Sequence, residues 1–246
     1  MLLHLQTWPD VEAYLKKSVG ILIPIGSTEQ HGPNGLVGTD AICAEVVARG
    51  VGEAAGALVA PTIAVGMAQH HLGFAGSMTL RPSTLIAVVR DNVLSLARHG
   101  FRRFYFVNGH GGNIATVSAA FSEIYAETSI AGGDNNPSLK CRLRNWWDVP
   151  AVRQLSRDLY GHAEGSHATP SEVSLTWHAY PAAARPMTLD PPVAPTGEFS
   201  DADDYRRNFP DGRIGSNPGL ASAEAGRRFL ETAVPYLAED YKRWVG

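Results

Sequence analysis

The sequence predicts an α/β fold in which a mostly parallel central sheet is covered by helices on both faces. Short apolar runs alternate with segments of helical composition along the first half of the chain. This alternation is typical of parallel sheets whose strands are buried on both sides. Polar, glycine-rich loops follow two of the apolar runs, where ligands usually bind in such folds. Because no repeat or low-complexity tract divides the 246 residues, we expect a single domain over 1–246.

The first predicted elements are a short helix, a buried strand, a long helix and an irregular strand. Thr7-Trp8-Pro9-Asp10 resembles a capping box before a helix that ends near residue 17. The apolar run 20–26 is bounded by glycines and predicts a buried strand. Residues 40–55 have helical composition, and 57–65 is typical of a strand, although Pro61 makes its pairing irregular.

A regular apolar stripe predicts the next helix. Ser83 can cap this helix and Gly100 can end it. The stripe consists of Ile86, Val89, Val93 and Leu96. Beyond it, 104–107 predicts a strand, 114–128 a helix and 139–147 a further strand.

The last part of the chain is predicted to contain two helices separated by a long loop. Residues 172–178 predict a short helix, whereas 181–220 are rich in proline, glycine and aspartate and predict irregular structure. Ser222 can cap a final helix that reaches Trp244 and is kinked at Pro235.

Composition excludes several classes of protein and leaves a surplus of histidine. The chain carries 21 basic and 24 acidic side chains, so it lacks the basic surface expected of a nucleic-acid-binding protein. No run approaches the ~18 apolar residues of a membrane span, and the first residues lack a signal-peptide pattern. Cys43 and Cys141 form neither a CxxC pair nor a disulfide framework, so we expect a cytoplasmic protein. Nine histidines remain, several of them beside glycines.

Polar residues with metal-binding chemistry follow the strand at 20–26. Glu29 and His31 alternate, so extended backbone would project both from one side. Asp40 lies at the start of the next helix, where an N-terminal cap is the more common use of an aspartate taken alone. His31 taken alone is equally consistent with one satisfied hydrogen bond.

A second polar loop follows the strand at 104–107. His110 lies among glycines in Gly109-His110-Gly111-Gly112, which permit tight turns and close backbone approach to a ligand. The alternative is a nucleotide-binding turn, but the third glycine of GxGxxG and its acidic partner are both missing from the sequence. In a parallel sheet the two loops can meet at one edge and form a single cleft.

Two histidines and two carboxylates form a nitrogen and oxygen ligand set suited to Zn²⁺, Mn²⁺ or Fe²⁺. A carboxylate such as Asp40 could bridge two ions in a hydrolytic centre. Without thiolate ligands, an open catalytic site is favoured over a closed structural one. A third region, 161–172, offers two more histidines and two more carboxylates. We expect His162 and Glu164 to lie in a solvated polar loop, whereas His167 and Glu172 are stronger candidates.

The chain resembles the creatininase (creatinine amidohydrolase) family in four motifs, in the family's order. The motifs are Pro24-Ile25-Gly26-Ser27-Thr28-Glu29-Gln30-His31-Gly32-Pro33 with Gly38-Thr39-Asp40, then Val107-Asn108-Gly109-His110-Gly111-Gly112-Asn113, then His167 with Glu172-Val173-Ser174, and Gly215-Ser216-Asn217-Pro218 leading to 221–226. The resemblance implies a three-layer α/β/α fold, two divalent metal ions per subunit and hydrolysis of a non-peptide C–N amide bond. It also implies a homo-oligomer, a hexamer built as a trimer of dimers.

Residue by residue, the resemblance implies that Glu29, Asp40 and His110 bind one ion and that His31 and Asp40 bind the second. Zinc is the first expectation for the metal, with manganese or iron as alternatives. His167 matches the family's catalytic histidine. The implied chemistry is attack by a metal-bound hydroxide on the amide carbon, with His167 as the general acid that protonates the leaving nitrogen.

The chain also departs from the family's pattern. Creatininases carry a glutamate that binds the second ion where this chain has Gly112, and we expect Glu172 to replace it; the alternative is a weak or empty second site. Ala163 stands where the creatinine pocket has a tryptophan, although Trp147 matches another pocket tryptophan. The Gly-Gly loop resembles the branch that contains a formamidopyrimidine-type deformylase and the mycofactocin-precursor peptidase, so these activities are alternatives to creatinine hydrolysis.

The remaining expectations concern the substrate pocket and the rival functions. His71 is a candidate pocket residue, with a packing role as the alternative, and Trp147 is a pocket wall or a core aromatic. The backbone of Gly111 and Gly112 can donate hydrogen bonds to the oxyanion. A small amide is the expected partner, with neither nucleic acid nor a membrane. A non-catalytic metal-binding or nucleotide-binding protein is the alternative from another class.

Overall fold

The computed structural model describes residues 1–132 and 138–246. Within them four strands form one fully parallel sheet in the order β2-β1-β3-β4. The strands are β1 (Gly20–Ile25), β2 (Leu58–Val59), β3 (Arg103–Asn108) and β4 (Lys140–Asn145). Ile25 is in register with Asn108, and Asn108 with Asn145. The loops that follow β1 and β3 therefore begin side by side at one edge of the sheet.

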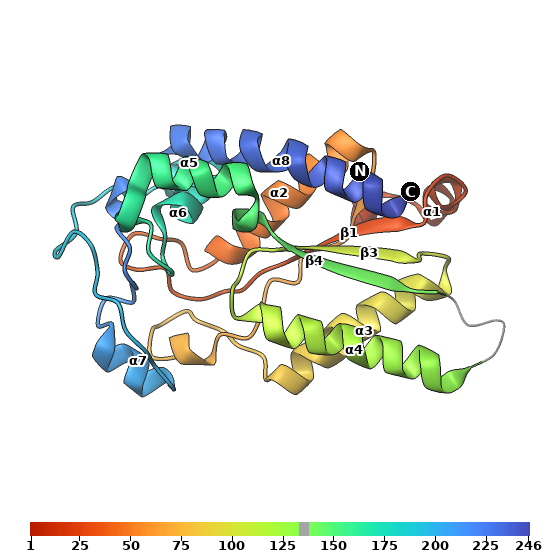
Figure 1. Ribbon diagram of the computed structural model, residues 1–246, viewed down its shortest axis with the longest axis horizontal. Helices are drawn as coiled ribbons and strands as arrows, with labels where there is room; N and C mark the ends of the chain where they lie inside the picture. The colour runs from red at the N-terminus through yellow and green to blue at the C-terminus, as the bar shows by residue number, and fades with distance from the viewer. Residues whose placement is uncertain (133–137) are drawn as a thin grey trace.

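Helices cover both faces of this sheet, which confirms the predicted three-layer α/β/α fold (Figure 1). One face carries α3 (Pro82–Arg98) and α4 (Asn113–Ala131). The opposite face carries α2 (Thr39–Ala55), α5 (Pro150–Tyr160), α6 (Pro170–Ala179) and α8 (Ala223–Val245). The two remaining α-helices of the described residues are α1 (Trp8–Leu15) and α7 (Ala202–Asn208).

Alternation along the strands divides the apolar core into two layers. Successive side chains of a strand point to opposite faces. Ile21 and Ile23 of β1 therefore pack with Phe104 and Phe106 of β3 in the cluster under α3 and α4. Leu22 and Tyr105 belong to the other cluster, under α2 and α8. Burial on both sides explains why these strands are continuous apolar runs in the sequence.

Most of the predicted elements are confirmed. The capping box before α1 is present, because the amide of Thr7 donates to Oδ2 of Asp10 at 3.1 Å. Ser222 caps α8 by accepting a hydrogen bond from the amide of Ala225 at 3.1 Å. Pro235 lies inside α8, as expected.

Several predictions about local structure were wrong. The strand predicted over 57–65 is only two residues long, because Pro61 cannot donate to a ladder. Arg81, not Ser83, is the N-cap of α3, and Pro82 takes the first helical position. The segment 181–220 contains α7, whose N-cap Asp201 accepts from the amide of Asp204 at 2.9 Å. Helix α5 was not predicted. No helix in the described ranges is long and apolar enough to cross a membrane.

Candidate metal centre

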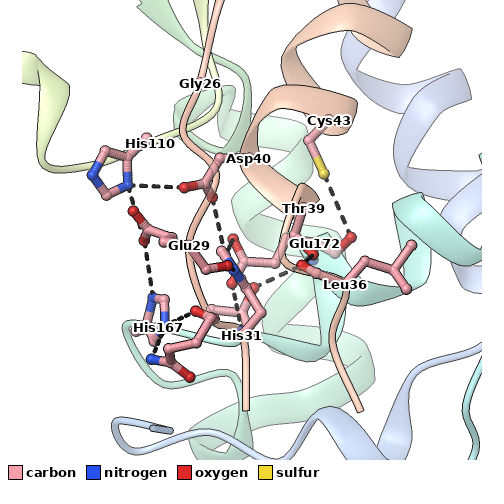
Figure 2. Close-up of polar contacts among 12 residues, drawn as sticks. Gly26, Glu29, His31, Leu36, Thr39, Asp40, Cys43, His110, His167 and Glu172 are labelled. Carbon is pink, nitrogen blue, oxygen red and sulfur yellow. Dashed lines mark hydrogen bonds and ion pairs between the residues drawn. The ribbon is translucent and has the colours of Figure 1, made fainter. Parts of the chain in front are cut away.

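The predicted metal ligands converge at the carboxyl ends of β1 and β3, although they come from four segments (Figure 2). Glu29 and His31 belong to the loop after β1, and Asp40 lies in the first turn of α2. His110 follows β3, and Glu172 lies in the first turn of α6. All five residues contribute to groups of side chains close enough together to hold a metal ion.

Two glycines allow the first turn of α2 to approach the strand ends. A Cβ atom on Gly26 would lie 2.4 Å from the amide nitrogen of Ala41, and one on Gly109 would lie 2.0 Å from the carbonyl oxygen of Asp40. Neither distance is tolerable for real atoms. The glycine before His110 thus serves close packing of α2 and the placement of Asp40. This explains why the loop has glycines without the full nucleotide-binding pattern.

Two histidines each place one ring nitrogen against a backbone carbonyl and the other against Asp40. Nδ1 of His31 lies 3.1 Å from the carbonyl oxygen of Glu29, and Nε2 of His110 lies 3.0 Å from that of Met67. Because a carbonyl oxygen only accepts, each of these nitrogens is a donor. The other nitrogen faces Asp40, with Nε2 of His31 3.1 Å from Oδ1 and Nδ1 of His110 2.9 Å from Oδ2, and it can bind a metal once it has released its proton.

The carboxylates of the cluster are only partly compensated by these contacts. Nδ1 of His110 also lies 3.3 Å from Oε1 of Glu29. Despite these close approaches, both oxygens of Glu29 and Oδ2 of Asp40 are buried without a hydrogen-bond partner among the described residues. Buried carboxylate oxygens are costly unless a cation or donor compensates them. The residues present therefore fit one or more divalent cations.

The candidate ligand atoms form three groups, two of which share Asp40. Those two are Glu29, Asp40 and His110, and His31, Asp40 and Glu172; the third is Glu29, His31 and His167, and the atoms of each group lie within 4.8 Å of one another. Asp40 directs one oxygen into each of the two groups that it shares. This arrangement contradicts the reading of Asp40 as a helix cap, because Gly38 is the N-cap of α2 and the Asp40 carboxylate is buried among histidines.

The ionisation of these groups reflects their mutual attraction. Burial lowers the pKa of His31, but Asp40, Glu172 and Glu29 outweigh burial and raise it to about 10. Burial likewise lowers the pKa of His110, and Glu29 with Asp40 raises it to about 9. Burial opposes ionisation of Asp40, but His31 and His110 hold the pKa of its carboxyl well below its usual range. Protons on the histidines can thus balance the carboxylates when no metal is bound.

Glu172 has two roles, one for each carboxylate oxygen. Its Oε1 accepts from the amide of Thr169 at 2.6 Å, and Oγ1 of Thr169 accepts from the amide of Glu172 at 3.3 Å. This reciprocal pair is a capping box at the start of α6. The cap leaves Oε2 facing Nε2 of His31 at 3.8 Å. Burial raises the pKa of Glu172 to about 7.

His167 and His71 stack on each other beside Glu29 but present opposite ring nitrogens to it. Nε2 of His167 lies 2.9 Å from both the backbone carbonyl oxygen and the side-chain amide nitrogen of Gln30, and its Nδ1 lies 3.8 Å from Oε1 of Glu29. The side-chain amide of Gln30 lies 3.0 Å from Nδ1 of His71, and Nε2 of His71 lies 3.1 Å from Oε1 of Glu29, within ion-pair distance. His71 therefore contacts a candidate ligand.

A cavity of about 520 Å³ opens over this centre. Asp40, His110, His167 and Glu172 line it, as do the predicted pocket residues Gly111 and Trp147. His71 and Gly112 do not line it, contrary to expectation. His71 lies beneath His167, and a Cβ atom on Gly112 would lie 2.4 Å from Nε2 of His110, so Gly112 makes room for that ring.

Sequence reasoning missed Glu164 as a residue of the cavity. We expected both His162 and Glu164 in a solvated loop; His162 is exposed, whereas Glu164 lines the cavity. Ser171 donates to Oε1 of Glu164, and Oε2 is buried without a partner among the described residues. Burial raises the pKa of Glu164. The spacing Thr169-Pro170-Ser171-Glu172, a capping-box pattern, is the sequence signal that places Ser171 and Glu172 on the same helical turn.

The chain matches known proteins over nearly its whole length. The family model described as creatinine amidohydrolase matches residues 4–241. Creatinine amidohydrolase from Pseudomonas putida is 30% identical, with 95% of this chain and 93% of that protein covered. The mycofactocin precursor peptide peptidase of Mycolicibacterium smegmatis is also 30% identical, with 91% of this chain and 85% of that protein covered.

Solved creatininase structures have the same fold. A manganese form superimposes with a TM-score of 0.83 at 27% identity, covering 99% of this chain and 98% of that one. A variant described as Zn–Zn type has a TM-score of 0.86 at 25% identity, with the same coverage. With its parallel sheet and its cluster of candidate ligand side chains at the strand ends, this chain belongs to the creatininase family of metal-dependent amidohydrolases.

Proposed function

We propose that this chain hydrolyses a non-peptide amide C–N bond, of the cyclic amide or formamide type, with two divalent ions per subunit. One observation carries the proposal: Asp40 directs one oxygen to Nε2 of His31 and the other to Nδ1 of His110. Glu29, Asp40 and His110 would hold one ion, and His31, Asp40 and Glu172 the other. Zinc is the first candidate and manganese or iron the alternatives, because nitrogen and oxygen ligands suit all three.

Divalent ions in such a site supply two effects, acidification of a water molecule and polarisation of the amide carbonyl. The chain supplies the proton transfers. Burial, with His71 and His31, lowers the pKa of His167 well below its ordinary value, so His167 enters the reaction neutral. Its Nδ1 takes a proton from the attacking water and passes it to the leaving nitrogen as the C–N bond breaks and the new C–O bond forms.

Other residues of the cavity position the substrate. Gly111 lines the cavity at the start of α4, and the backbone N–H groups of Gly111 and Gly112 are candidates to stabilise the oxyanion. Trp147 supplies an apolar wall. Nε2 of His71, 3.1 Å from Oε1 of Glu29, helps to hold that carboxylate in place, as outer residues commonly do for metal ligands.

The substrate has one first candidate and two alternatives. Creatinine is the first candidate, and a formamidopyrimidine is the first alternative. A short precursor peptide, cleaved at a peptide bond, is the second alternative, since the chain is equally identical to creatinine amidohydrolase and to the mycofactocin precursor peptide peptidase. Gly112 and Ala163 stand where the resemblance places a glutamate and a tryptophan in creatininases, which favours the two alternatives. A panel containing all three, assayed for C–N cleavage with the metal-loaded protein, ranks them.

Metal analysis of variants tests the proposal. Asp40→Ala, and the closer mimic Asp40→Asn, should lose bound metal by elemental analysis, whereas Asp91→Ala on exposed α3 should not. Retention of two ions per chain by both Asp40 variants would refute the shared-ligand arrangement. A wild type that binds two ions yet cleaves no amide would instead support the non-catalytic metal-binding alternative.

We further propose that the chain acts as one domain over 1–246 within a cytoplasmic homo-oligomer. Both cysteines are free thiols, as in a reducing compartment, and the family resemblance favours a hexamer of three dimers. Mass measurement by light scattering distinguishes a hexamer from a dimer or a monomer.

A further inference from the structure

One side of the cavity carries positive charge. Helix α5 buries Val152, Ser156 and Tyr160, each four residues after the one before. Arg153 and Arg157 each follow one of these positions, and both line the cavity. Because residues four apart lie on the same helical face, the two guanidinium groups belong to one stripe of α5 beside the candidate metal centre.

The two arginines differ in their partners. The guanidinium of Arg153 lies 2.6 Å from Oδ1 of Asp148 and forms an ion pair. Arg157 donates to the neutral Oε1 of Gln154 at 2.6 Å. Within 1–132 and 138–246, no carboxylate lies within ion-pair distance of Arg157. The charge of Arg157 is therefore uncompensated at the cavity.

The carboxylates that line the same cavity are already engaged. Asp40 and Glu172 face His31, and Glu164 accepts a hydrogen bond from Ser171. None of the three is paired with Arg157. The cavity thus contains candidate metal ligands and, apart from them, the guanidinium of Arg157, which has no carboxylate partner among the described residues. Trp147 and Val152 also line it. A guanidinium binds oxyanions through paired N–H donors.

We propose that the substrate is an amide that also carries an anionic group, a carboxylate or a phosphate, and that Arg157 binds this group. The inference rests on the proposed hydrolase function and adds the substrate class to it. Arg153 contributes less, because Asp148 already offsets its charge. The apolar wall accommodates the part of the substrate between its anionic group and its amide.

Binding of small acids tests this proposal without requiring turnover. Butyrate ends in one carboxylate, glutarate carries a second carboxylate at the other end of the same chain, and 4-phosphonobutyrate carries a phosphonate at that end instead. Each acid is titrated calorimetrically into the manganese-loaded and into the metal-free protein. For each form, the titrations give the ratio of the dianion affinity to the butyrate affinity. We expect glutarate or the phosphonate to bind about tenfold more tightly than butyrate in the wild type. The preferred dianion identifies the anionic group.

Substitutions assign the preference to a residue. Arg157→Gln should abolish the preference for the dianion and leave the butyrate affinity unchanged. Arg153→Gln should reduce this preference only in part, and the exposed control Arg185→Gln should retain the full preference. Equal binding of all three acids by the wild type, or an unchanged preference in Arg157→Gln, would overturn the proposal. Failure of the proposed function is recognised separately, because the wild type would then bind no metal by elemental analysis or, with metal bound, cleave no amide of the substrate panel.

Discussion

Nε2 of His167 lies 2.9 Å from both the backbone carbonyl oxygen and the side-chain amide nitrogen of Gln30. Because Gln30 contacts Nε2 in both ways, Nδ1 is the ring nitrogen that faces Glu29, 3.8 Å from its Oε1. The loop after β1 therefore supplies two candidate ligands and also orients the ring proposed to move the proton. Backbone carbonyls likewise hold Nδ1 of His31 and Nε2 of His110, so that the other nitrogen of each ring faces Asp40.

Removing the His167 ring should separate metal binding from turnover. His167→Ala should lower kcat about 10²–10⁴-fold, because general acid–base catalysis contributes on that scale, while the protein keeps its metal. His162→Ala, on the exposed part of the same segment, is the matched control and should leave kcat unchanged. Wild-type kcat in His167→Ala would exclude the proton-transfer role.

The capping role of Oε1 of Glu172 and the proposed metal-binding role of its Oε2 can be tested separately. Glu172→Gln keeps an acceptor for the cap, since glutamine also serves in a capping box, but should lower the metal content from two ions to one. Thr169→Ala removes the side-chain acceptor for the Glu172 amide and should destabilise the fold by about 1 kcal/mol with both ions retained. Denaturant titration and elemental analysis measure the two effects. Two tightly held ions in Glu172→Gln would remove Glu172 from the ligand set.

The adjacent glycines of the second loop should respond differently to a methyl group. A Cβ on Gly112 would lie 2.4 Å from Nε2 of His110, whereas one on Gly111 meets nothing within 4 Å. Gly112→Ala should therefore displace the His110 ring, weaken metal binding and cost about 1–3 kcal/mol of stability. Gly111→Ala should keep the metal affinity and the unfolding midpoint. Equal metal affinities of the two variants would show that the His110 ring does not depend on Gly112.

Metal affinity should rise with pH. Without metal, the pKa of His31 is raised to about 10 and that of His110 to about 9 by the surrounding carboxylates, and burial raises the pKa of Glu172 to about 7. Each group must release its proton before it binds an ion, so protons compete with metal below these values. Competition with a chelator should give tighter Mn²⁺ binding at about pH 8.5 than at about pH 6.5. A pH-independent affinity would contradict this balance of charge.

The sheet and the ligand loops were predictable because their signals are local. The strands at 20–26 and 104–107 are apolar runs, and a parallel sheet places the loops after them at one edge. Helix α5 was missed because Ser156 lies in the middle of its buried face, which interrupts the apolar pattern. Helix α7 is short and lies in a segment rich in turn-forming residues.

Other features of the site depend on contacts that no local pattern contains. The burial of Glu164 requires Ser171 from the next helix, and the orientation of His71 requires the side chain of Gln30. The capping alternative for Asp40 was reasonable for an aspartate at a helix start. It was wrong because Gly26 and Gly109 bring the first turn of α2 against the strand ends.

Anomalous diffraction from crystals of the metal-loaded protein tests the central claim most directly. The shared position of Asp40 predicts two peaks, one beside Glu29 and His110 and the other beside His31 and Glu172, with the Asp40 carboxylate between them. A single peak, or peaks that do not contact Asp40, would contradict the proposed two-ion centre.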